Sequence, residues 1–491
     1  MRRRPTTGRG RHRPAFADIR KRLRPVRTAR PSRSTSRTAR GSATVRERSE
    51  HPTEEGAPVE HVRYRTLAGA LAVALAVTAC GGGGEGDDGA GAASGGPIDL
   101  WHIQTDHADL LEDAAARYEA DHEGAQVDVT AIENETYKTQ IRVALGAGEA
   151  PCVFISWGGG PLVEYVAADQ VVDLGDRLEQ DGYRERFVDV AFDNVSVDDG
   201  VYGVPVENTA AAVVWYDQVT FEEQGLTPPT TWDELLTVVD ELQAAGIAPF
   251  ALANSGSWPG SMYYMYLVDR LAGPEVFEAA ATRSGGSFED EVFVEAGRML
   301  QDLVERGAFA EGINGLDWDA GQSRALMYSG DAAMELMGNW NLSIVQTENP
   351  DYAAERLGWF PFPAVEGGEG DPSNIVGTIG DNYYHVASTC EDPDAAFEVI
   401  QYLIDDESAE AREAIGRIPP LVDFEAEDPV LADLVETINA ADSVQLWYDQ
   451  YLPPELAQVH LETTQALFGL SMTPEEAASR MEAAAVSYFD E

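Results

Sequence analysis

Strand-like and helix-like stretches alternate along residues 98–155, and this order allows only a few kinds of fold. Three stretches have the apolar or alternating composition of strands; they are residues 98–103, 127–132 and 153–155. Leu111, Ala115 and Tyr118 would share one face of a helix between the first two, and residues 137–145 have a second helical pattern. Parallel strands need such helical crossovers, so the order predicts an α/β fold with parallel-rich sheets flanked by helices. Ligands of these sheets bind beyond the carboxyl ends of the strands.

Three later helices have recognisable starting signals. Thr231 and Thr473 are each followed three residues later by a glutamate, Glu234 and Glu476, which is the capping-box pattern. Asp392 precedes a proline, and this pair also favours a helix start. The sequence contains no repeat of roughly 20 to 50 residues, so solenoids and propellers are disfavoured.

An export signal is predicted ahead of this region. Two arginines precede an uncharged apolar run over residues 67–77, which is shorter than the ~20 residues that span a bilayer. The run has the length of the apolar part of a signal peptide. Residues 77–80, Val-Thr-Ala-Cys, resemble the lipobox of bacterial lipoproteins, in which the cysteine is acylated and becomes the mature N-terminus. We therefore expect a signal peptide over residues 63–79 and a lipid on Cys80; an ordinary signal peptide with a chance cysteine is the alternative.

The segments on the two sides of this signal differ in composition and charge. Residues 1–62 are Arg-rich, and we expect a disordered extension, with the true translation start near Val62. Residues 80–97, mainly Gly, Ala, Asp and Glu, predict a flexible linker after the lipidated cysteine. The first 65 residues carry 19 Lys and Arg against 6 Asp and Glu, whereas the remaining 426 carry 15 against 79. Such an acidic body repels polyanions, which excludes nucleic acid as its partner.

Several kinds of chemistry lack the residues that they need. The only lysines are Lys21 and Lys138, so a phosphate-binding loop with its lysine and a Schiff-base enzyme are both disfavoured. His102 and His107 are five residues apart, a spacing that does not place two metal ligands on one helix face. We therefore expect no metal site, no cofactor and no catalytic residues.

Six short stretches follow one another in a characteristic order; they are residues 146–153, 200–206, 214–217, 228–235, 329–334 with 338–340, and 473–478. In this order, behind a lipobox, they resemble extracellular solute-binding protein family 1, the sugar-binding lipoproteins of carbohydrate ABC importers. Residues 155–160 are also similar to actinobacterial receptors for oligosaccharides such as xylobiose. Cys152 stands where the family usually has Asp. Cys152 and Cys390 could pair in an oxidising compartment or remain free thiols.

The resemblance implies a two-lobed clamshell, the type II fold of periplasmic binding proteins. Lobe 1 would contain residues 98–205 and 375–405, and lobe 2 would contain residues 207–370 and 411–491. The hinge would run through residues 204–207. Closure would then be a population shift toward the state in which the ligand touches both lobes.

The same resemblance implies a function. We expect a monomeric, lipid-anchored protein at the extracellular face of the cell membrane, which binds a neutral oligosaccharide and delivers it to the permease subunits of an ABC transporter. Such a protein is not an enzyme. Two other interpretations stay open: a secreted glycoside hydrolase, whose cleft would also contain acids and tryptophans, and a receptor for another small polar solute.

Saccharide binding needs aromatic rings over the C–H faces and planar polar groups for the hydroxyls. Four tryptophans are predicted to supply the rings; they are Trp157, Trp258, Trp340 and Trp447. Trp157 precedes three glycines, which would let the backbone approach the ligand, and Trp340 matches a family position that stacks on sugar. Polar ligand-binding residues are predicted at strand ends and at the hinge; they are Gln104, Asp106, Glu133, Asn134, Glu207, Asp381 and Asn382. The tryptophans predicted to be structural are Trp101, Trp215, Trp232 and Trp359.

Replacing Cys80 by alanine is expected to release the protein from the membrane, because the acyl chains on this cysteine are its predicted anchor. Cell fractionation followed by immunoblotting should find the wild-type chain with the membranes and the Cys80→Ala chain in the soluble fraction. Cys152→Ser, which leaves the lipobox intact, is the control. Membrane recovery of Cys80→Ala equal to that of wild type would contradict the lipoprotein interpretation.

Overall fold

The structure is a computed structural model that describes residues 96–490. The expected extension over residues 1–62, the signal peptide over residues 63–79 and Cys80 lie outside the described residues. Those expectations therefore remain predictions from sequence. Within the described part, the model has no helix of the length and apolar character that crossing a membrane requires.

The first part of the main sheet follows the predicted alternation of strands and helices. β1 (Ile98–His102) pairs in parallel with both β2 (Val127–Ala131) and β3 (Val153–Ser156). α2 (Ala108–Asp121) and α3 (Asn134–Ala147) form the crossovers. The parallel arrangement and the five predicted elements are confirmed, with ends that differ by a few residues.

The described residues contain a nine-stranded sheet with a mixed centre. Its strand order is β2-β1-β3-β10-β6-β8-β7, with β11 beside β10 and β9 beside β6. β10 is antiparallel to both β3 and β6. β4 and β5 form a separate antiparallel pair. The remaining strands are β4 (Ser196–Val197), β5 (Gly200–Val201), β6 (Val204–Asp217), β7 (Ala248–Phe250), β8 (Ala332–Gly338), β9 (Leu357–Phe360), β10 (Ile375–Val386) and β11 (Val444–Gln445).

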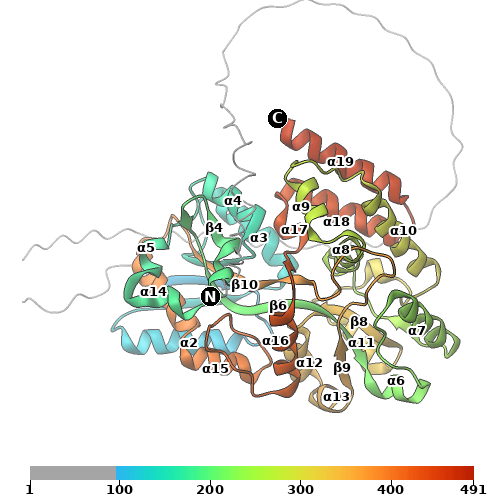
Figure 1. Cartoon of the computed structure of the whole chain (residues 1–491). Helices are drawn as coiled ribbons and strands as arrows, with labels where there is room; N and C mark the ends of the chain where they lie inside the picture. Colours follow the sequence, from blue (N-terminus) through green and yellow to red (C-terminus); the bar gives the residue numbers. More distant parts are fainter. Residues whose placement is uncertain (1–95, 491) are drawn as a thin grey trace, which may run out of the picture. The chain divides into compact units, whose positions relative to one another are not determined.

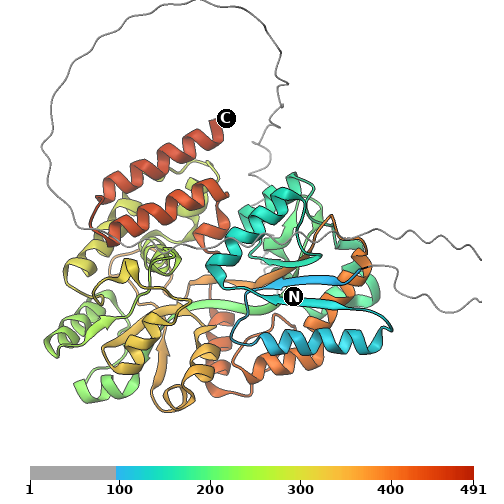
Figure 2. The ribbon, with the colours of Figure 1, turned by 180° about the vertical axis from the view of Figure 1, so that it is seen from behind.

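β6 and β10 each contribute to two separate hydrophobic cores. Core A contains the buried residues of β1 and β3 together with Val206 of β6, whereas Ala210 of the same strand already belongs to core B, with α7, α8, α10 and β8. β10 crosses in the opposite direction, from Val376 in core B to Tyr383 in core A. Figure 2 shows the two strands running side by side. The two cores are therefore joined by a pair of hydrogen-bonded strands.

The crossing stretch between the cores is polar although it is buried. Its buried polar residues are Glu207, Asn208 and Thr209 on β6, and Thr378, Asp381 and Asn382 on β10. The register between the strands shifts on both sides of Asp381, and Asn382 has a left-handed backbone with φ of 51°. On β6, lobe 1 is predicted to end at residue 205 and lobe 2 to begin at residue 207, next to this polar stretch; these limits stay predictions. Ile375 and Val376, which the prediction assigned to lobe 1, pack in core B.

Helices cover both cores. α2, α14 and α15 lie side by side along core A (Figure 1), whereas α8, α10, α18 and α19 pack against one another around core B. The remaining helices are α4 (Gly159–Ala167), α5 (Gly175–Leu178), α6 (Gln218–Gln224), α7 (Trp232–Ala244), α8 (Trp258–Ala272), α9 (Pro274–Ala281), α10 (Glu291–Glu305), α11 (Gln322–Ser329), α12 (Asn341–Glu348), α13 (Pro350–Glu355), α14 (Pro393–Leu403), α15 (Asp406–Ala414), α16 (Pro429–Ala440), α17 (Tyr448–Tyr451), α18 (Pro454–Phe468) and α19 (Pro474–Asp490), and 3-10 helices span Gln180–Arg186, Asp189–Val195 and Ile313–Gly315.

The predicted helix caps are confirmed. The Thr231 side chain accepts a hydrogen bond from the Glu234 backbone N–H, and Glu234 accepts one from the Thr231 N–H, which completes a capping box at α7. Thr473 and Glu476 make the same reciprocal pair at α19, with distances of 3.2 and 3.0 Å. Asp392 caps α14 by accepting from the backbone N–H of Ala395 at 3.1 Å.

Cys152 and Cys390 form a disulfide, which the sequence alone left open. Cys152 lies just before β3 and Cys390 lies in the turn after β10, and the antiparallel pairing of these two strands brings the cysteines together. Their Cα atoms are 4.7 Å apart, although 238 positions separate them in the sequence. The bond therefore closes a loop that contains most of core B.

Removing this disulfide is expected to lower the free energy of unfolding by about 2 to 4 kcal/mol, because a long loop loses its covalent closure in the unfolded chain. The comparison is between wild type and the Cys152→Ser/Cys390→Ser double variant, by urea unfolding under oxidising conditions. Reducing agent should bring wild type to the midpoint of the double variant and leave the variant unchanged. Equal midpoints for both proteins without reducing agent would contradict the pairing.

Candidate ligand-binding site

Glu207 is fully buried on the crossing stretch of β6, and both of its carboxylate oxygens are bonded. Arg412 of α15 donates to Oε1 from Nη2 at 2.9 Å and to Oε2 from Nε at 3.1 Å. Tyr384 of β10 donates its hydroxyl to Oε1 at 3.0 Å, and His107 Nε2 lies 3.2 Å from Oε2. Because charges buried away from water need this kind of compensation, four separate elements are held together around one carboxylate.

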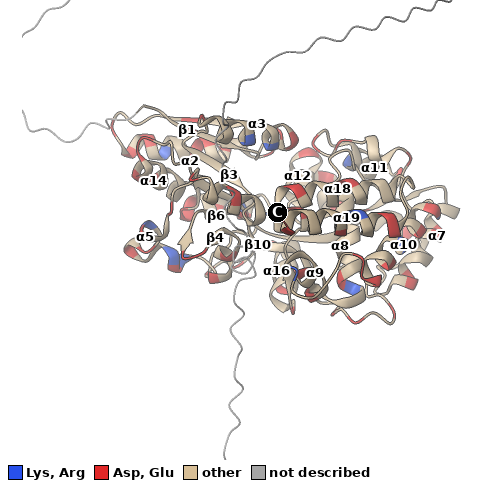
Figure 3. Ribbon diagram, turned by 90° about the horizontal axis from the view of Figure 1, so that it is seen from above, with Lys and Arg blue, Asp and Glu red and all other residues tan. Residues whose placement is uncertain are grey.

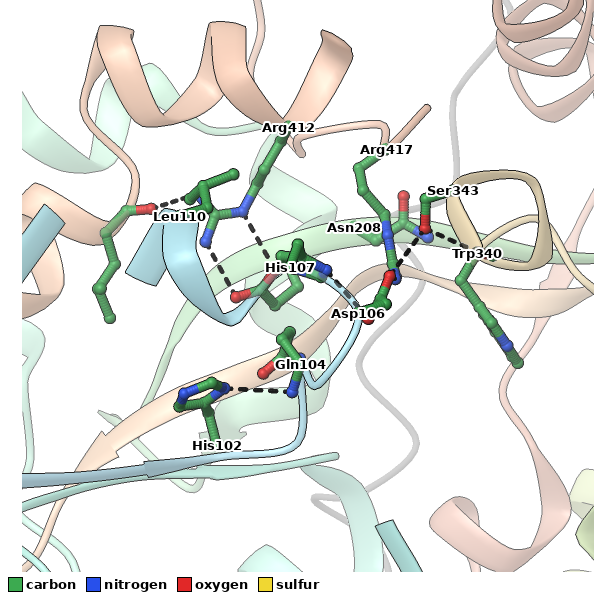
Figure 4. A network of polar contacts seen from close by, with 12 residues as sticks. His102, Gln104, Asp106, His107, Leu110, Asn208, Trp340, Ser343, Arg412 and Arg417 are labelled. Atoms are coloured by element: carbon green, nitrogen blue, oxygen red, sulfur yellow. Dashed lines mark hydrogen bonds and ion pairs between the residues drawn. The ribbon is translucent and has the colours of Figure 1, made fainter. Parts of the chain in front are cut away.

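The chain of charges continues from His107 toward core B (Figure 4). His107 Nδ1 lies 3.1 Å from Asp106 Oδ1. Asp106 Oδ2 accepts from Arg417 at 2.9 Å and from the hydroxyl of Ser343 at 3.1 Å. Ser343 lies in α12, whose neighbouring residues pack in core B, whereas α2 packs in core A. The loop after β1 is therefore connected to both cores.

Electrostatics keeps these groups ionised at neutral pH. Burial alone would raise the pKa of the Glu207 carboxyl, but Arg412 and His107 hold it well below its usual range. Burial opposes the low pKa of Asp106 in the same way, and Arg417 and His107 outweigh it. Burial also disfavours protonated His107, yet its hydrogen bonds to Asp106 and Glu207 raise its pKa. The network thus contains two carboxylates, two guanidinium groups and an imidazole biased toward its charged form.

Two asparagines next to the network position Trp340. Asn208 Oδ1 accepts from the backbone of Ile418 at 2.8 Å, and its Nδ2 donates to Asn339 Oδ1 at 3.2 Å. Asn339 also donates to the Thr209 carbonyl at 3.0 Å, so the turn before α12 is tied to β6. A side chain at position 338 would overlap the indole of Trp340, which explains the glycine there.

Trp340 belongs to a row of four tryptophans around core B. Its ring centroid lies 5.8 Å from that of Trp447 and 6.3 Å from that of Trp258, which in turn lies 5.2 Å from Trp318. Three of these side chains are half-buried, and Trp447 is buried. Three members were predicted; Trp318 was missed, although its position between two aspartates in a loop is a signal that it is not core.

Trp157 reaches this row through a lysine. Its ring packs edge-on against Tyr137 at 6.2 Å, and Lys138 Nζ lies 5.5 Å from its centroid and 5.8 Å from that of Trp258. Nothing in the sequence pattern around Lys138 predicted this position between two tryptophans. The interpretation of the three glycines after Trp157 needs correction: side chains there would overlap backbone carbonyls of residues 194, 450 and 452, so the glycines serve packing of α4.

Two of the predicted polar residues lie on β10 at the crossing. Asp381 is buried, and burial raises its pKa to about 7. It accepts a hydrogen bond from the backbone N–H of Asn382 at 2.9 Å. Asn382 Oδ1 is buried and has no hydrogen-bond partner among the described residues. These two side chains therefore have polar atoms that a ligand could still engage.

Gln104 lies in the loop after β1, Glu133 lies in the loop after β2, and Asn134 is the first residue of α3. Gln104 is buried, and its Oε1 lies 3.4 Å from the hydroxyl oxygen of Tyr384. Glu133 is exposed just before α3. Asn134 is half-buried and donates to Glu135 at 3.0 Å. Within residues 96–490, no group of three or more His, Cys, Asp and Glu side chains could hold a metal ion.

The tryptophans predicted to be structural are placed in or against the cores. Trp215 is 1 % exposed and donates from Nε1 to the carbonyl of Met337 at 3.1 Å. Trp232 is buried at the start of α7, and Trp359 of β9 pairs with Trp215 across the sheet. Trp101 of β1 is half-buried against core A.

Comparison with known proteins places this geometry in context. The model of the family described as bacterial extracellular solute-binding protein matches residues 104–410. An uncharacterised ABC transporter extracellular-binding protein of Pyrococcus horikoshii is 24% identical over 307 residues, which are 60% of this chain and 65% of that protein. A diacetylchitobiose-binding protein of Streptomyces coelicolor is 25% identical over 220 residues, 42% of this chain and 46% of that protein. The chain thus spans slightly less than two thirds of the Pyrococcus relative.

Solved structures share the fold over most of the described chain. A protein from a study of xylan utilisation by Caldanaerobius polysaccharolyticus superimposes with a TM-score of 0.74 and 27% identity, covering 79% of this chain and 99% of that one. A chitin oligosaccharide binding protein gives a TM-score of 0.73 and 25% identity, covering 80% and 99%. The predicted α/β clamshell fold of type II is confirmed by these similarities.

Glu207→Gln is expected to lower the free energy of unfolding by about 3 to 5 kcal/mol at pH 7, because it leaves Arg412 buried without a full counter-charge. The control is Glu291→Gln, which removes an exposed partner of Arg298 and should cost less than about 1 kcal/mol. Urea unfolding measures both. A loss for Glu207→Gln no larger than that for Glu291→Gln would contradict the role assigned to the buried pair.

Urea unfolding of wild type and Glu207→Gln at several pH values tests the directions of the pKa shifts of Glu207, Asp106 and His107. Glu207 and Asp106 have lowered pKa values, so their stabilisation is present above about pH 4 and is lost as the pH falls below it. His107 has a raised pKa, so its contribution is complete below about pH 6.5 and is lost as the pH rises through its folded pKa. The difference in free energy of unfolding between wild type and Glu207→Gln should therefore become smaller as the pH is lowered toward 3.

Proposed function

The chain belongs to the bacterial extracellular solute-binding protein family, and on this basis we propose that it is the substrate-binding component of an ABC transporter that imports a neutral oligosaccharide. It would be anchored by a lipid on Cys80 at the extracellular face of the cell membrane. The saccharide would be released unaltered to the permease subunits. The family match, the arrangement of tryptophans and the export signal predicted from the sequence support this proposal.

The observation that carries the proposal is that indole rings of both cores, Trp157 and Trp258, lie 5.5 and 5.8 Å from the same ammonium group, that of Lys138. Trp157 packs against core A, and Trp258, Trp340 and Trp447 belong to core B or pack against it. Indole rings offer flat apolar surfaces of the kind that the C–H faces of sugars cover. A saccharide that touches rings of both cores would favour the arrangement in which they are close together, which is how ligand-driven closure works.

The charge of the site favours an uncharged ligand over an anion. The buried guanidinium groups of Arg412 and Arg417 are already bonded to Glu207 and Asp106. Figure 3 shows acidic residues on most helices and basic residues at few positions. A phosphate or sulfate group would have to displace a buried carboxylate from its partner, which is costly. A sugar hydroxyl needs no such exchange.

The relatives add support from their own ligands. One relative is a diacetylchitobiose-binding protein, and one structural neighbour is a chitin oligosaccharide binding protein. The structure of a neighbour in complex with raffinose has a TM-score of 0.65 at 20% identity, which supports the fold alone. The diacetylchitobiose-binding relative and the chitin oligosaccharide binding protein favour a saccharide over another small polar solute as the first ligand class to test.

A glycoside hydrolase is the competing interpretation. Such an enzyme needs two carboxyl groups about 5 to 9 Å apart, flanking one glycosidic bond, with one of them available as an acid. Asp106 and Glu207 are both ionised and paired with arginines. Neither carboxyl group therefore carries a proton that it could donate to a glycosidic oxygen. The hydrolase interpretation gains support if incubation with xylo- and malto-oligosaccharides gives shorter products.

A thermal-shift screen should find a raised melting temperature with at least one of xylobiose, diacetylchitobiose, raffinose and malto-oligosaccharides, because a ligand of the folded state stabilises it by mass action. For that saccharide, Trp340→Ala and Trp157→Ala are expected to weaken binding by about tenfold or more each, through loss of ring contact. Calorimetric titration measures the affinities.

Trp359→Ala is the matched control, because this half-buried tryptophan lies on β9 beside Trp215 and outside the row. It should lower the melting temperature without changing saccharide affinity by more than about twofold. Unchanged affinity in both Trp157→Ala and Trp340→Ala would show that the proposed binding surface is wrong. A screen with no saccharide shift would overturn the proposed function itself.

A further inference from the structure

Lys138 is the single lysine within the described residues, and its position is unusual for a lysine. Lysines on an acidic surface normally extend into water, where pairing with a carboxylate contributes little. The Lys138 side chain is 28% exposed, and its ammonium group lies between the rings of Trp157 and Trp258, at 5.5 and 5.8 Å from their centroids. A cation at these distances is attracted by both aromatic faces.

The two rings come from different cores, so the lysine bridges them. Trp157 packs against core A and Trp258 against core B. A second contact joins the same regions, because the backbone N–H of Glu135 donates to Asp319 Oδ2 at 3.2 Å. The first turns of α3 therefore face the tryptophan row across the region where we propose that the saccharide binds.

Most hydrogen-bonding capacity of this lysine is unused. An ammonium group has three N–H donors and no acceptor. Glu135 Oε1, at 2.8 Å, is the one hydrogen-bond acceptor of Lys138 Nζ in the part of the chain that the structure describes. Asn134 also donates to Glu135, which holds this carboxylate at the start of α3. Two N–H groups of Lys138 are left for another acceptor.

The charged side chains elsewhere in the site are paired with one another or are acidic. Arg412 and Arg417 are occupied by Glu207 and Asp106, and the buried side chain of Asp381 adds a further carboxyl group. A carboxyl group such as that of Asp381 can accept a hydrogen bond from a sugar hydroxyl. Ring and glycosidic oxygens can only accept, so a bound saccharide also needs a donor from the protein. Lys138 is placed to supply it beside the two rings.

We propose that Lys138 contacts the saccharide and determines specificity by donating hydrogen bonds to acceptor oxygens of the sugar unit that packs against Trp157 and Trp258. This inference rests on the proposed function and adds a residue and a requirement to it. The sugar unit at that position must present oxygens on the edge that faces α3. A unit without such oxygens would leave the ammonium group unpaired and would bind less tightly.

The test uses the full chain and whichever of xylobiose, diacetylchitobiose and raffinose raises its melting temperature most. Lys138→Met keeps an unbranched apolar stem over the rings and removes the donors, and it should raise Kd by about 10- to 100-fold. Arg142→Met is the matched control, because it removes one positive charge from an exposed position on the same helix and should change Kd less than twofold. Lys138→Arg, which retains donors, should recover part of the loss.

Chemical modification gives a readout that a purely structural role would not change. Acetylation of the wild-type chain by N-hydroxysuccinimidyl acetate, followed by peptide mass spectrometry, should slow at least fivefold at Lys138 with saturating saccharide. Lys21, the only other lysine, precedes the predicted mature N-terminus at Cys80, so a lysine-containing peptide added to the same reaction is the reference and should react at an unchanged rate. Equal Kd values for Lys138→Met and Arg142→Met, or an unprotected Lys138, would overturn this inference alone. Absence of saccharide binding by wild type would overturn the proposed function together with it.

Discussion

The buried carboxylate of Glu207 sets the conditions that the surrounding structure has to meet. β6 crosses between the two hydrophobic cores at this residue, and an ionised group there is stable only with bonded counter-charges. Arg412 and His107 provide positive charge, and Tyr384 adds a hydrogen bond from its neutral hydroxyl. Breaking such a cluster costs far more than an exposed ion pair, so these elements hold one arrangement at the crossing. Glu207 was predicted as a ligand-binding residue, but the structure shows its oxygens engaged by the protein.

The tryptophan row depends on this crossing. Asp106 extends the network to Ser343, whose hydroxyl oxygen also lies 3.0 Å from the carbonyl oxygen of Trp340. The asparagines at positions 208 and 339 tie the same turn to β6. The tryptophan row and the buried charges are therefore connected, because the polar contacts fix the turn that positions Trp340. This is the kind of support that a binding site needs when its contacts are mostly flat rings.

Most of the local structure could be predicted from the sequence, and the reason is that it is local. Period-two and helical apolar patterns predicted β1, α2, β2, α3 and β3, and capping residues predicted the starts of α7, α14 and α19. Trp215 could be assigned to the core from its apolar neighbours, and Trp232 could be assigned a structural role from its place at a helix start. The two-lobed fold was predicted from the resemblance to solute-binding proteins. That resemblance depends on the order of six short stretches along the chain and not on any single residue.

What the sequence determined by itself was the order of elements, the acid excess of the body and the scarcity of lysine, since these are properties of neighbouring residues or of composition. Only the tertiary structure decided which groups meet. The disulfide requires β3 to pair with β10, and Arg412 reaches Glu207 across 205 positions. The roles of Trp318 and Lys138 likewise depend on rings brought together from distant segments. Such contacts leave no periodic trace in the sequence, because each is set by the packing of whole elements and not by the spacing of residues along the chain.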